Sequence, residues 1–347
     1  MKSKVYFLPL DSGKDLNANR AKYVSFLNFV FNETNFFSSI PSHKKIGIKV
    51  HFGEEGRENY LNPEYVREVV LLCGGSGLQP YLLETATLYR GKRQEEKSHF
   101  ELAQQHGFTL QKVLAPIIFV DGKRGEFYSE INGKKIGRRL KGFKFLINLA
   151  HFKGHMVTGF GGALKNIGMG LAAKGGKLDM HSVSIPYIDE SKCSFCGTCA
   201  EYCPNEAIIF RQGRYLINNK CVGCSGCLTI CPNYAIQIKW DSSSEELQKK
   251  VAEYAHSILK DRFCLHFNFL IDITPNCDCF PKTEEPIVKD IGILASFDPV
   301  ALDQAGYDMV KDNIKAIYPQ INPEIVLKVG EELGIGSREY ELCPYEI

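Results

Sequence analysis

Eight of the 13 cysteines in this chain fall into two groups of identical spacing, and this repeat constrains the protein more than any other feature of its sequence. Each group reads C-x2-C-x2-C-x3-C-P, and the second begins 28 residues after the first, at position 221 instead of 193. The similarity extends past the cysteines, because Cys-Pro-Asn-Glu-Ala-Ile at 203–208 returns as Cys-Pro-Asn-Tyr-Ala-Ile at 231–236. A short module is therefore repeated within the chain.

This spacing is typical of a segment that holds two iron–sulfur clusters. A C-x2-C-x2-C loop wraps three thiolates around one cubane cluster, and the fourth cysteine, followed by proline, binds the other cluster. Residues 188–239 resemble the bacterial two-cluster ferredoxins, with all eight ligands and both prolines matched. We therefore expect one [4Fe–4S] cluster on Cys193, Cys196, Cys199 and Cys231, and a second on Cys221, Cys224, Cys227 and Cys203.

A pair of zinc sites is the alternative interpretation of these cysteines. Zinc usually takes two C-x2-C pairs separated by a longer loop, whereas here three cysteines follow one another at steps of three residues. The spacing therefore favours iron–sulfur clusters. In a reducing compartment, so many cysteines also indicate metal binding or catalysis rather than disulfides.

Charge and hydropathy narrow the choice of partners. The chain has 42 Lys and Arg against 40 Asp and Glu, so it lacks the basic excess that marks nucleic-acid or anionic-membrane binding. No apolar run approaches the roughly 20 residues of a membrane span, and the N-terminus has no signal-peptide pattern. We expect a cytoplasmic protein that meets a redox partner protein or a small-molecule substrate, with no nucleic acid and no membrane.

Outside the cysteine module, apolar β-rich runs alternate with helical patterns. This alternation predicts an α/β fold with a mostly parallel sheet, into which an α+β ferredoxin-like module is inserted. Residues 1–187 and 240–347 would be the two parts of the α/β domain, and 188–239 the insertion. Helices are expected from 62 to about 73, from 243 to 260 and after about residue 300. The expected strands cover 4–8, 46–52, 81–84, 117–121, 145–149, 263–271 and 290–296.

Polar residues interrupt the strand patterns where an ordinary fold does not require them. Alternation puts Lys49 and His51 on one face of a strand end. His151, Lys153 and His155 follow another strand and precede a glycine-rich turn, whose backbone amides could meet an anion. Because open α/β sheets bind ligands at the carboxyl ends of their strands, these five are candidate catalytic residues. For Lys49 and His51 the alternative is a half-exposed strand with solvated polar groups.

The remaining candidates are two cysteines in a C-x-C turn, Cys277 and Cys279. They follow a strand on which Cys264 and His266 share the polar face. Such a turn could bind an additional metal or cycle as a dithiol. The alternative is a pair of reduced, partly buried cysteines that behave as small hydrophobic residues.

These segments together resemble the family called domain of unknown function 362, in its form with an inserted two-cluster ferredoxin. The resemblance covers nearly the whole chain and implies iron–sulfur binding without implying a reaction. It rests on K-V-H-F-G-E at 49–54, N-L-A-H-F-K-G-H at 148–155, G-G-A-L-K-N-I-G-M-G at 161–170, Lys177 with His181, C-D-C at 277–279 and D-P-V-A-L-D at 298–303.

Three functions are compatible with these features. In the first, an oxidoreductase, the clusters pass electrons to a site in the α/β domain, where cationic side chains bind a small substrate and His or Lys supplies protons. In the second, the protein is a non-catalytic electron carrier. In the third, it is a non-redox enzyme whose clusters stabilise the fold or sense oxygen.

Overall fold

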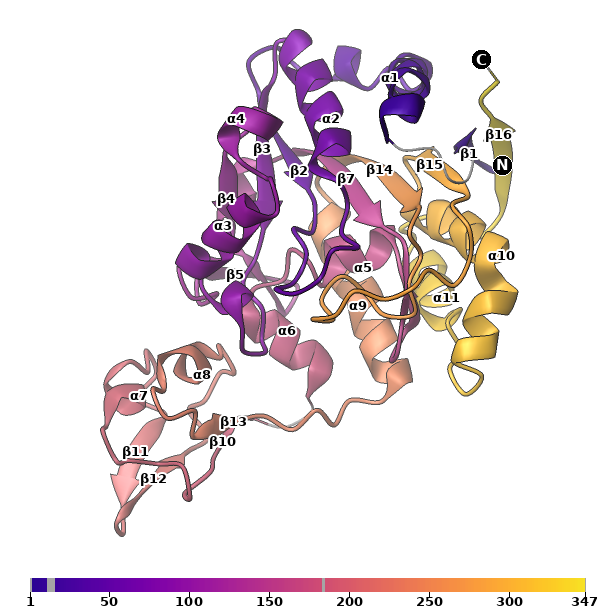
Figure 1. The fold of residues 1–347 in the computed structure, drawn as a ribbon. Helices are drawn as coiled ribbons and strands as arrows, with labels where there is room; N and C mark the ends of the chain where they lie inside the picture. Colours follow the sequence, from indigo (N-terminus) through magenta and orange to yellow (C-terminus); the bar gives the residue numbers. More distant parts are fainter. Residues whose placement is uncertain (1, 11–15, 183–184, 347) are drawn as a thin grey trace.

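The computed structural model describes residues 2–10, 16–182 and 185–346, and an eight-stranded sheet forms its centre (Figure 1). Its strands are β1 (Ser3–Pro9), β2 (Lys45–Lys49), β3 (Gln79–Glu84), β4 (Ile117–Phe119), β7 (Phe145–His151), β14 (Phe263–Leu270), β15 (Gly292–Ser296) and β16 (Tyr340–Pro344). They are ordered β16-β1-β15-β14-β7-β2-β3-β4. All neighbours are parallel except β15, which is antiparallel to both β1 and β14. The predicted α/β class with a mostly parallel sheet is confirmed.

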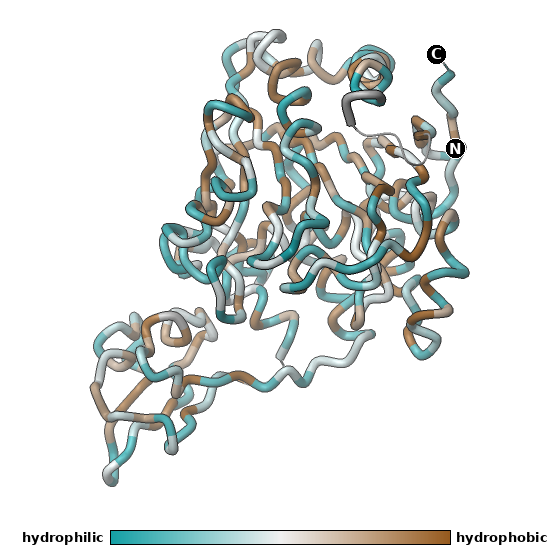
Figure 2. Tube along the Cα trace, in the orientation of Figure 1, coloured by the Kyte–Doolittle hydropathy of each residue, from teal (hydrophilic) through white to brown (hydrophobic). Residues whose placement is uncertain are grey.

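Helices cover both faces of the sheet. One face packs against α1 (Leu16–Glu33), α2 (Pro63–Gly75), α3 (Glu96–Gln105) and α4 (Leu110–Val113). The other packs against α5 (Ala163–Gly168), α6 (Lys174–His181), α9 (Ser244–Leu259), α10 (Pro299–Ile317) and α11 (Ile325–Glu332). Hydrophobic residues follow the central strands, and hydrophilic residues gather on many outer turns (Figure 2). The sheet therefore separates two hydrophobic cores.

Local sequence signals account for the main helix starts. Asn62 caps α2 by accepting the Glu64 amide, and Pro63 occupies the first turn. Ser243 and Glu246 form a capping box at α9. Asp298 caps α10 by accepting the amides of residues 300 and 301. The helices predicted from 62, from 243 and after about residue 300 are confirmed.

Two expectations about the strands were wrong. The second strand ends at Lys49 rather than at residue 52, because the chain turns at Gly53, which has a φ of +84°. Lys49 is moreover fully buried, so the half-exposed strand with solvated polar groups is excluded for it. The C-terminal region also adds a strand, β16, to a segment expected to be helical.

The cysteine-rich segment packs around a small hydrophobic cluster of its own that includes Ile208, Leu228 and Ile236. The segment extends from the body of the molecule on two connections, one after α6 and one before α9 (Figure 1). The pairing of β10 with β13 holds its ends together. Its elements are β10 (Tyr187–Ile188), α7 (Thr198–Glu201), β11 (Ile208–Arg211), β12 (Arg214–Ile217), α8 (Gly226–Ile230) and β13 (Ile236–Gln237).

The remaining elements are short. Two hairpins pair β5 (Tyr128–Ile131) with β6 (Lys134–Gly137) and β8 (Lys153–His155) with β9 (Gly159–Gly161). Single 3-10 turns cover Phe37–Ser39, Lys92–Gln94 and Arg138–Gly142. Among the helices of the described residues, none is long and apolar enough to cross a membrane.

Candidate functional site

The eight repeated cysteines line two hollows in the cysteine-rich segment. The fourth cysteine of each group crosses over, so that Cys231 joins the first hollow and Cys203 joins the second. Each hollow therefore receives four thiol groups, the number that one [4Fe–4S] cluster requires. The first hollow is lined by Cys193, Cys196, Cys199 and Cys231, and the second by Cys203, Cys221, Cys224 and Cys227.

The backbone around the two hollows repeats as the sequence does. The amide of Ala207 donates to Cys203 Sγ over 3.3 Å, and the amide of Ala235, 28 residues later, donates to Cys231 Sγ over 3.2 Å. Amide donors of this kind stabilise negatively charged sulfur. Left-handed backbone also recurs at the same offset, in the pairs Phe195 and Gly223, Gly197 and Ser225, and Glu206 and Tyr234. These features fit the residues to two cubane clusters.

The second hollow lies against the α/β body. A Cβ atom built on Gly175, in the first turn of α6, would lie 2.7 Å from the Gly223 carbonyl oxygen and 3.1 Å from Cys224 Cα. The cysteine-rich segment contacts the body at a second place, where the Arg90 guanidinium stacks on the ring of Tyr234 at 3.6 Å and donates to its carbonyl oxygen over 2.8 Å. The glycine thus lets the cysteine loop approach the helix that carries Lys177.

A buried charge network occupies the carboxyl ends of β2 and β3. Lys49 Nζ donates to Glu84 Oε1 over 3.0 Å, and the Arg93 guanidinium lies 3.6 Å from both Glu84 and Glu54. Burial lowers the pKa of Lys49. Burial alone would raise the pKa of Glu84, but the charges of Lys49, Arg93 and Lys177 hold it below its ordinary value. The structure therefore places Lys49 in an ion pair.

Helix α6 joins this network to the neighbouring strand ends. Lys177 Nζ donates to Thr85 Oγ1 over 2.5 Å and to the Ala172 carbonyl over 2.7 Å. The carboxylate of Asp121, just after β4, accepts the Ala86 amide. Burial lowers the pKa of Lys177 to about 8 and raises that of Asp121 to about 7. Both side chains can therefore change charge near neutral pH.

The C-x-C turn is held in place by the aspartate between its two cysteines. The Asp278 carboxylate lies 3.0 Å from His151 Nδ1, 3.8 Å from Lys153 Nζ and 3.5 Å from Arg57 Nε. Burial would raise its pKa, but these groups hold it below the ordinary value. His151 and Lys153, both candidates from the sequence, therefore contact the turn through Asp278. Burial lowers the pKa of Lys153 to about 8.

A glycine allows this turn to lie against β8. A Cβ atom at Gly154 would lie 2.2 Å from the Pro275 carbonyl oxygen, and the Gly154 amide donates to the Thr274 carbonyl over 2.9 Å. No other residue type fits at this position without moving the backbone. The sequence Lys153-Gly154-His155 thus brings His155 against the C-x-C turn.

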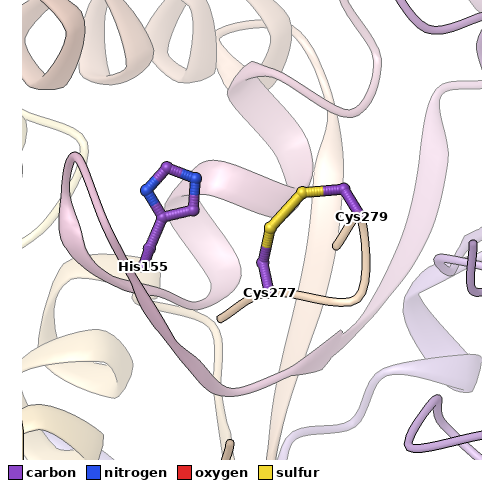
Figure 3. Close-up of side chains that lie close together, drawn as sticks. All are labelled: His155, Cys277 and Cys279. Carbon is purple, nitrogen blue, oxygen red and sulfur yellow. A yellow bond between two sulfur atoms is a disulfide. The ribbon is translucent and has the colours of Figure 1, made fainter. Parts of the chain in front are cut away.

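His155 faces the two cysteines of the turn (Figure 3). Cys277 and Cys279 are joined by a disulfide, and the possible ligand atoms of these two residues and His155 all lie within 4.8 Å of one another. Only with the disulfide reduced to two thiols would the three residues form a group that could hold a metal ion. His155 is buried, and burial lowers its pKa well below the ordinary value. Its Nδ1 accepts the amides of Val157 and Thr158 over 3.2 and 3.1 Å.

Two further side chains complete the candidate site. His51 Nδ1 accepts the Gly53 amide over 3.0 Å, and burial, followed by the charges of Arg93 and Lys49, lowers its pKa well below the ordinary value. Burial lowers the pKa of Lys165, on α5, to about 7. Among the described residues Lys165 has no hydrogen-bond or ion-pair partner, yet its charge acts on both His51 and His155.

The structure separates the sequence candidates into two groups. His151, Lys153, His155, Cys277 and Cys279 lie together around the C-x-C turn. Lys49 instead pairs with Glu84. Burial lowers the pKa of His51, and the positive charges of Arg93 and Lys49 lower it further. Sequence reasoning missed Glu84, Arg93 and Asp278. It noted Lys165 only as part of the glycine-rich run and did not select it as a candidate residue.

Other polar candidates have structural partners. His266 Nδ1 accepts a hydrogen bond from the side-chain Nδ2 of Asn148 over 3.0 Å in the interior, where burial lowers the pKa of His266 to about 3. Asp303 accepts the Ala163 and Leu164 amides over 2.7 and 2.9 Å and so fixes the start of α5. Neither residue reaches the C-x-C turn by a hydrogen bond.

A comparison with protein families identifies the chain. The model described as "Domain of unknown function (DUF362)" matches residues 46–308, which is most of the sequence. The protein belongs to the DUF362 family. The matched range of this DUF362 protein contains every candidate residue named above, together with the cysteine-rich segment. The family description assigns no reaction.

Comparisons with individual proteins add no function. No curated protein matches the sequence. Among solved structures, the DUF362 chain is similar to a Thermotoga maritima protein, with 10% identity and a TM-score of 0.40, covering 93% of this chain and 61% of the other. It is also similar to the lactate racemase apoprotein of Thermoanaerobacterium thermosaccharolyticum, with 12% identity and a TM-score of 0.38, covering 77% of this chain and 49% of the other. The chain thus spans less than two thirds of the length of either neighbour.

Proposed function

We propose that this protein is an iron–sulfur oxidoreductase in which eight cysteines hold two [4Fe–4S] clusters that serve a redox site in the α/β domain. The observation that carries the proposal is the division of the repeated cysteines into two hollows with four thiols each. When bound, such clusters would supply one-electron transfer. The zinc alternative is disfavoured because each hollow combines three closely spaced cysteines with one cysteine from the other repeat.

The contact between the cysteine loop and α6 supports a relay rather than a separate carrier. Gly223 and Cys224, which flank the second hollow, touch Gly175 at the start of α6. Two residues further along that helix, Lys177 donates to Thr85 beside the Lys49–Glu84 pair. A free carrier would not require its cysteine loop to approach a buried charge network in this way.

The chain's own residues would handle protons and charge. Lys165 and Lys177 have lowered pKa values of about 7 and 8, so each can hold or release a proton near neutral pH. Lys165 has no partner among the described residues, and we assign it the binding of an anionic group of a small substrate. Lys49 and Lys153 would position Glu84 and Asp278 rather than bind substrate, since both already contact these carboxylates.

The test is metal analysis of protein purified without oxygen. We expect about eight iron and eight acid-labile sulfide per chain. Replacing Cys199 with serine should remove iron from the first site, and replacing Cys227 with serine should remove it from the second. The matched control is Cys343→Ser, because Cys343 lies on β16, outside both hollows.

Each other outcome points to a different function. Little iron with about two zinc per chain would contradict the proposal and make the segment a structural zinc module. A different result would support the non-catalytic carrier. In that case the protein holds two intact clusters, and its Lys165→Met variant transfers electrons to every acceptor tested as fast as the unmodified chain does.

A further inference from the structure

We propose that Cys277 and Cys279 form a redox-active dithiol–disulfide pair, in which His155 Nε2–H donates a hydrogen bond to the sulfur that becomes a thiolate. The pair would be the two-electron acceptor within the redox site. This inference rests on the proposed function for the source of its electrons, which is a one-electron donor acting through the clusters. The dithiol pair itself rests on contacts of the α/β domain alone.

The first argument is the hydrogen bonding of the His155 ring. Both groups that approach Nδ1, the amides of Val157 and Thr158, are backbone donors, so Nδ1 must offer a lone pair. In the neutral imidazole the proton then lies on Nε2. The ring edge opposite its own loop faces the two sulfurs (Figure 3). His155 therefore presents an N–H group, and not a lone pair, to Cys277 and Cys279.

This arrangement favours thiol chemistry over a metal ion. A neutral histidine ligates a metal through an unprotonated nitrogen, and both backbone amides would have to leave Nδ1 before Nε2 could serve. The carboxylate of Asp278, the residue between the two cysteines in the chain, is already shared among His151, Lys153 and Arg57. Among the described residues the group has three possible ligands, one fewer than a closed tetrahedral site needs.

The second argument is that the segment carrying both sulfurs is held in place by buried side chains. Arg57 donates to the carbonyls of Asn276 and Lys282 over 3.1 and 3.0 Å, so it clamps the segment from both sides. Asp278 is buried between the two cysteines. Both cysteine residues remain partly exposed. A preorganised pair can open and close without a large movement of the chain.

The step balances as a two-electron reduction. The Cys277–Cys279 sulfur–sulfur bond breaks, two electrons enter one at a time, and two protons arrive, giving two thiols. Solvent supplies both protons, and His155 Nε2–H donates a hydrogen bond to the thiolate that forms first. Two one-electron centres are well matched to such an acceptor, since together they deliver the two electrons that one disulfide takes.

The experiment reads the two cysteines directly. Protein that holds its clusters is oxidised with ferricyanide, reduced with sodium dithionite under argon, treated with N-ethylmaleimide and digested. Mass spectrometry then reports the peptide that contains Cys277 and Cys279. We expect this peptide to be unlabelled and disulfide-linked after oxidation and doubly labelled after reduction. His155→Phe should slow the reduction by about tenfold, the effect of losing one hydrogen bond to a charged group, without changing iron content.

Variants and a second reductant separate the two proposals. Cys277→Ser and Cys279→Ser should each leave one cysteine labelled in both states, whereas Cys343→Ser should behave as the unmodified chain. If the purified protein contains no iron but dithiothreitol still reduces its Cys277–Cys279 disulfide, the electron relay is contradicted and the dithiol pair is supported. If the protein has two reducible clusters but Cys277 and Cys279 remain thiols after treatment with ferricyanide, the proposed dithiol pair is wrong. The electron relay would be unaffected by that result.

Discussion

Residues around the C-x-C turn show how burial changes the chemistry of ordinary side chains. Lys153 is 1% exposed and has its pKa lowered to about 8, because a buried ammonium loses hydration that Asp278 only partly replaces. Asp278 remains charged because His151, Lys153 and Arg57 surround it. Burial lowers the pKa of Lys165 in the same way, but no carboxylate is within ion-pair distance of its ammonium in the described structure.

The lowered pKa of Lys165 should be visible as unusual reactivity. An amine reacts with acetic anhydride only when it is unprotonated, and a pKa of about 7 leaves about half of Lys165 unprotonated at pH 7. Labelling of Lys165 relative to the exposed Lys141 should therefore fall by at least about tenfold between pH 7 and pH 10, because ordinary lysines become reactive only at high pH. A ratio that stays constant over this range, measured by competitive acetylation and mass spectrometry, would contradict the assignment.

Removing the charge of Asp278 should destabilise the protein strongly. Asp278→Asn would leave the buried Lys153 ammonium and Arg57 guanidinium without their shared carboxylate. We expect a loss of about 3–5 kcal/mol in the free energy of unfolding, the usual cost of breaking a buried ion pair. Urea unfolding without oxygen measures it. The control is the exposed Glu285→Gln, and equal stability of the two variants would show that the Asp278 contacts are weak.

At the scale of elements, the strand ends gather the site and two glycines bring its parts into contact. β2, β3, β7 and β14 are parallel, so residues that follow them meet at one edge of the sheet. Gly154 lets β8 lie against the C-x-C turn, and Gly175 lets the second cysteine loop lie against α6. These two contacts join segments that lie more than 45 residues apart in the chain.

Gly175→Ala should therefore disturb the second cysteine set. The added methyl group would meet backbone atoms of Gly223 and Cys224, which cannot rotate away as a side chain can. We expect iron to fall from about eight towards about four atoms per chain after gel filtration. Gly142→Ala is the matched control, because nothing lies within 4 Å of its Cβ position. Equal iron in both variants would show that the loop adapts to the methyl group.

At the scale of the whole molecule, the sequence predicted what periodicity and spacing determine. The α/β class, the mostly parallel sheet and the helix starts near residues 62, 243 and 300 are confirmed, because each depends on a short pattern. The strand β16 was missed because its pairing partner, β1, lies at the other end of the chain. A short pattern carries no record of such a distant partner.

The candidate site also has a part that the sequence predicted and a part that it could not predict. His151, Lys153, His155, Cys277 and Cys279 were selected from local patterns, and the structure gathers them around one turn. That Lys49 is paired with Glu84 could not be predicted, because the two residues are brought together only by the pairing of β2 with β3. The same holds for Arg57 and Asp278, which are 221 positions apart by number and 3.5 Å apart in space.

The measurement that tests the central claim most directly is electron paramagnetic resonance of the protein purified without oxygen and reduced with dithionite. Two reduced [4Fe–4S] clusters in one small segment should give about two spins per chain, with spectra broadened by their interaction. The Cys199→Ser variant should retain the signal of a single cluster without this broadening. A reduced protein without any iron–sulfur signal, and with about two zinc ions per chain instead, would contradict the account.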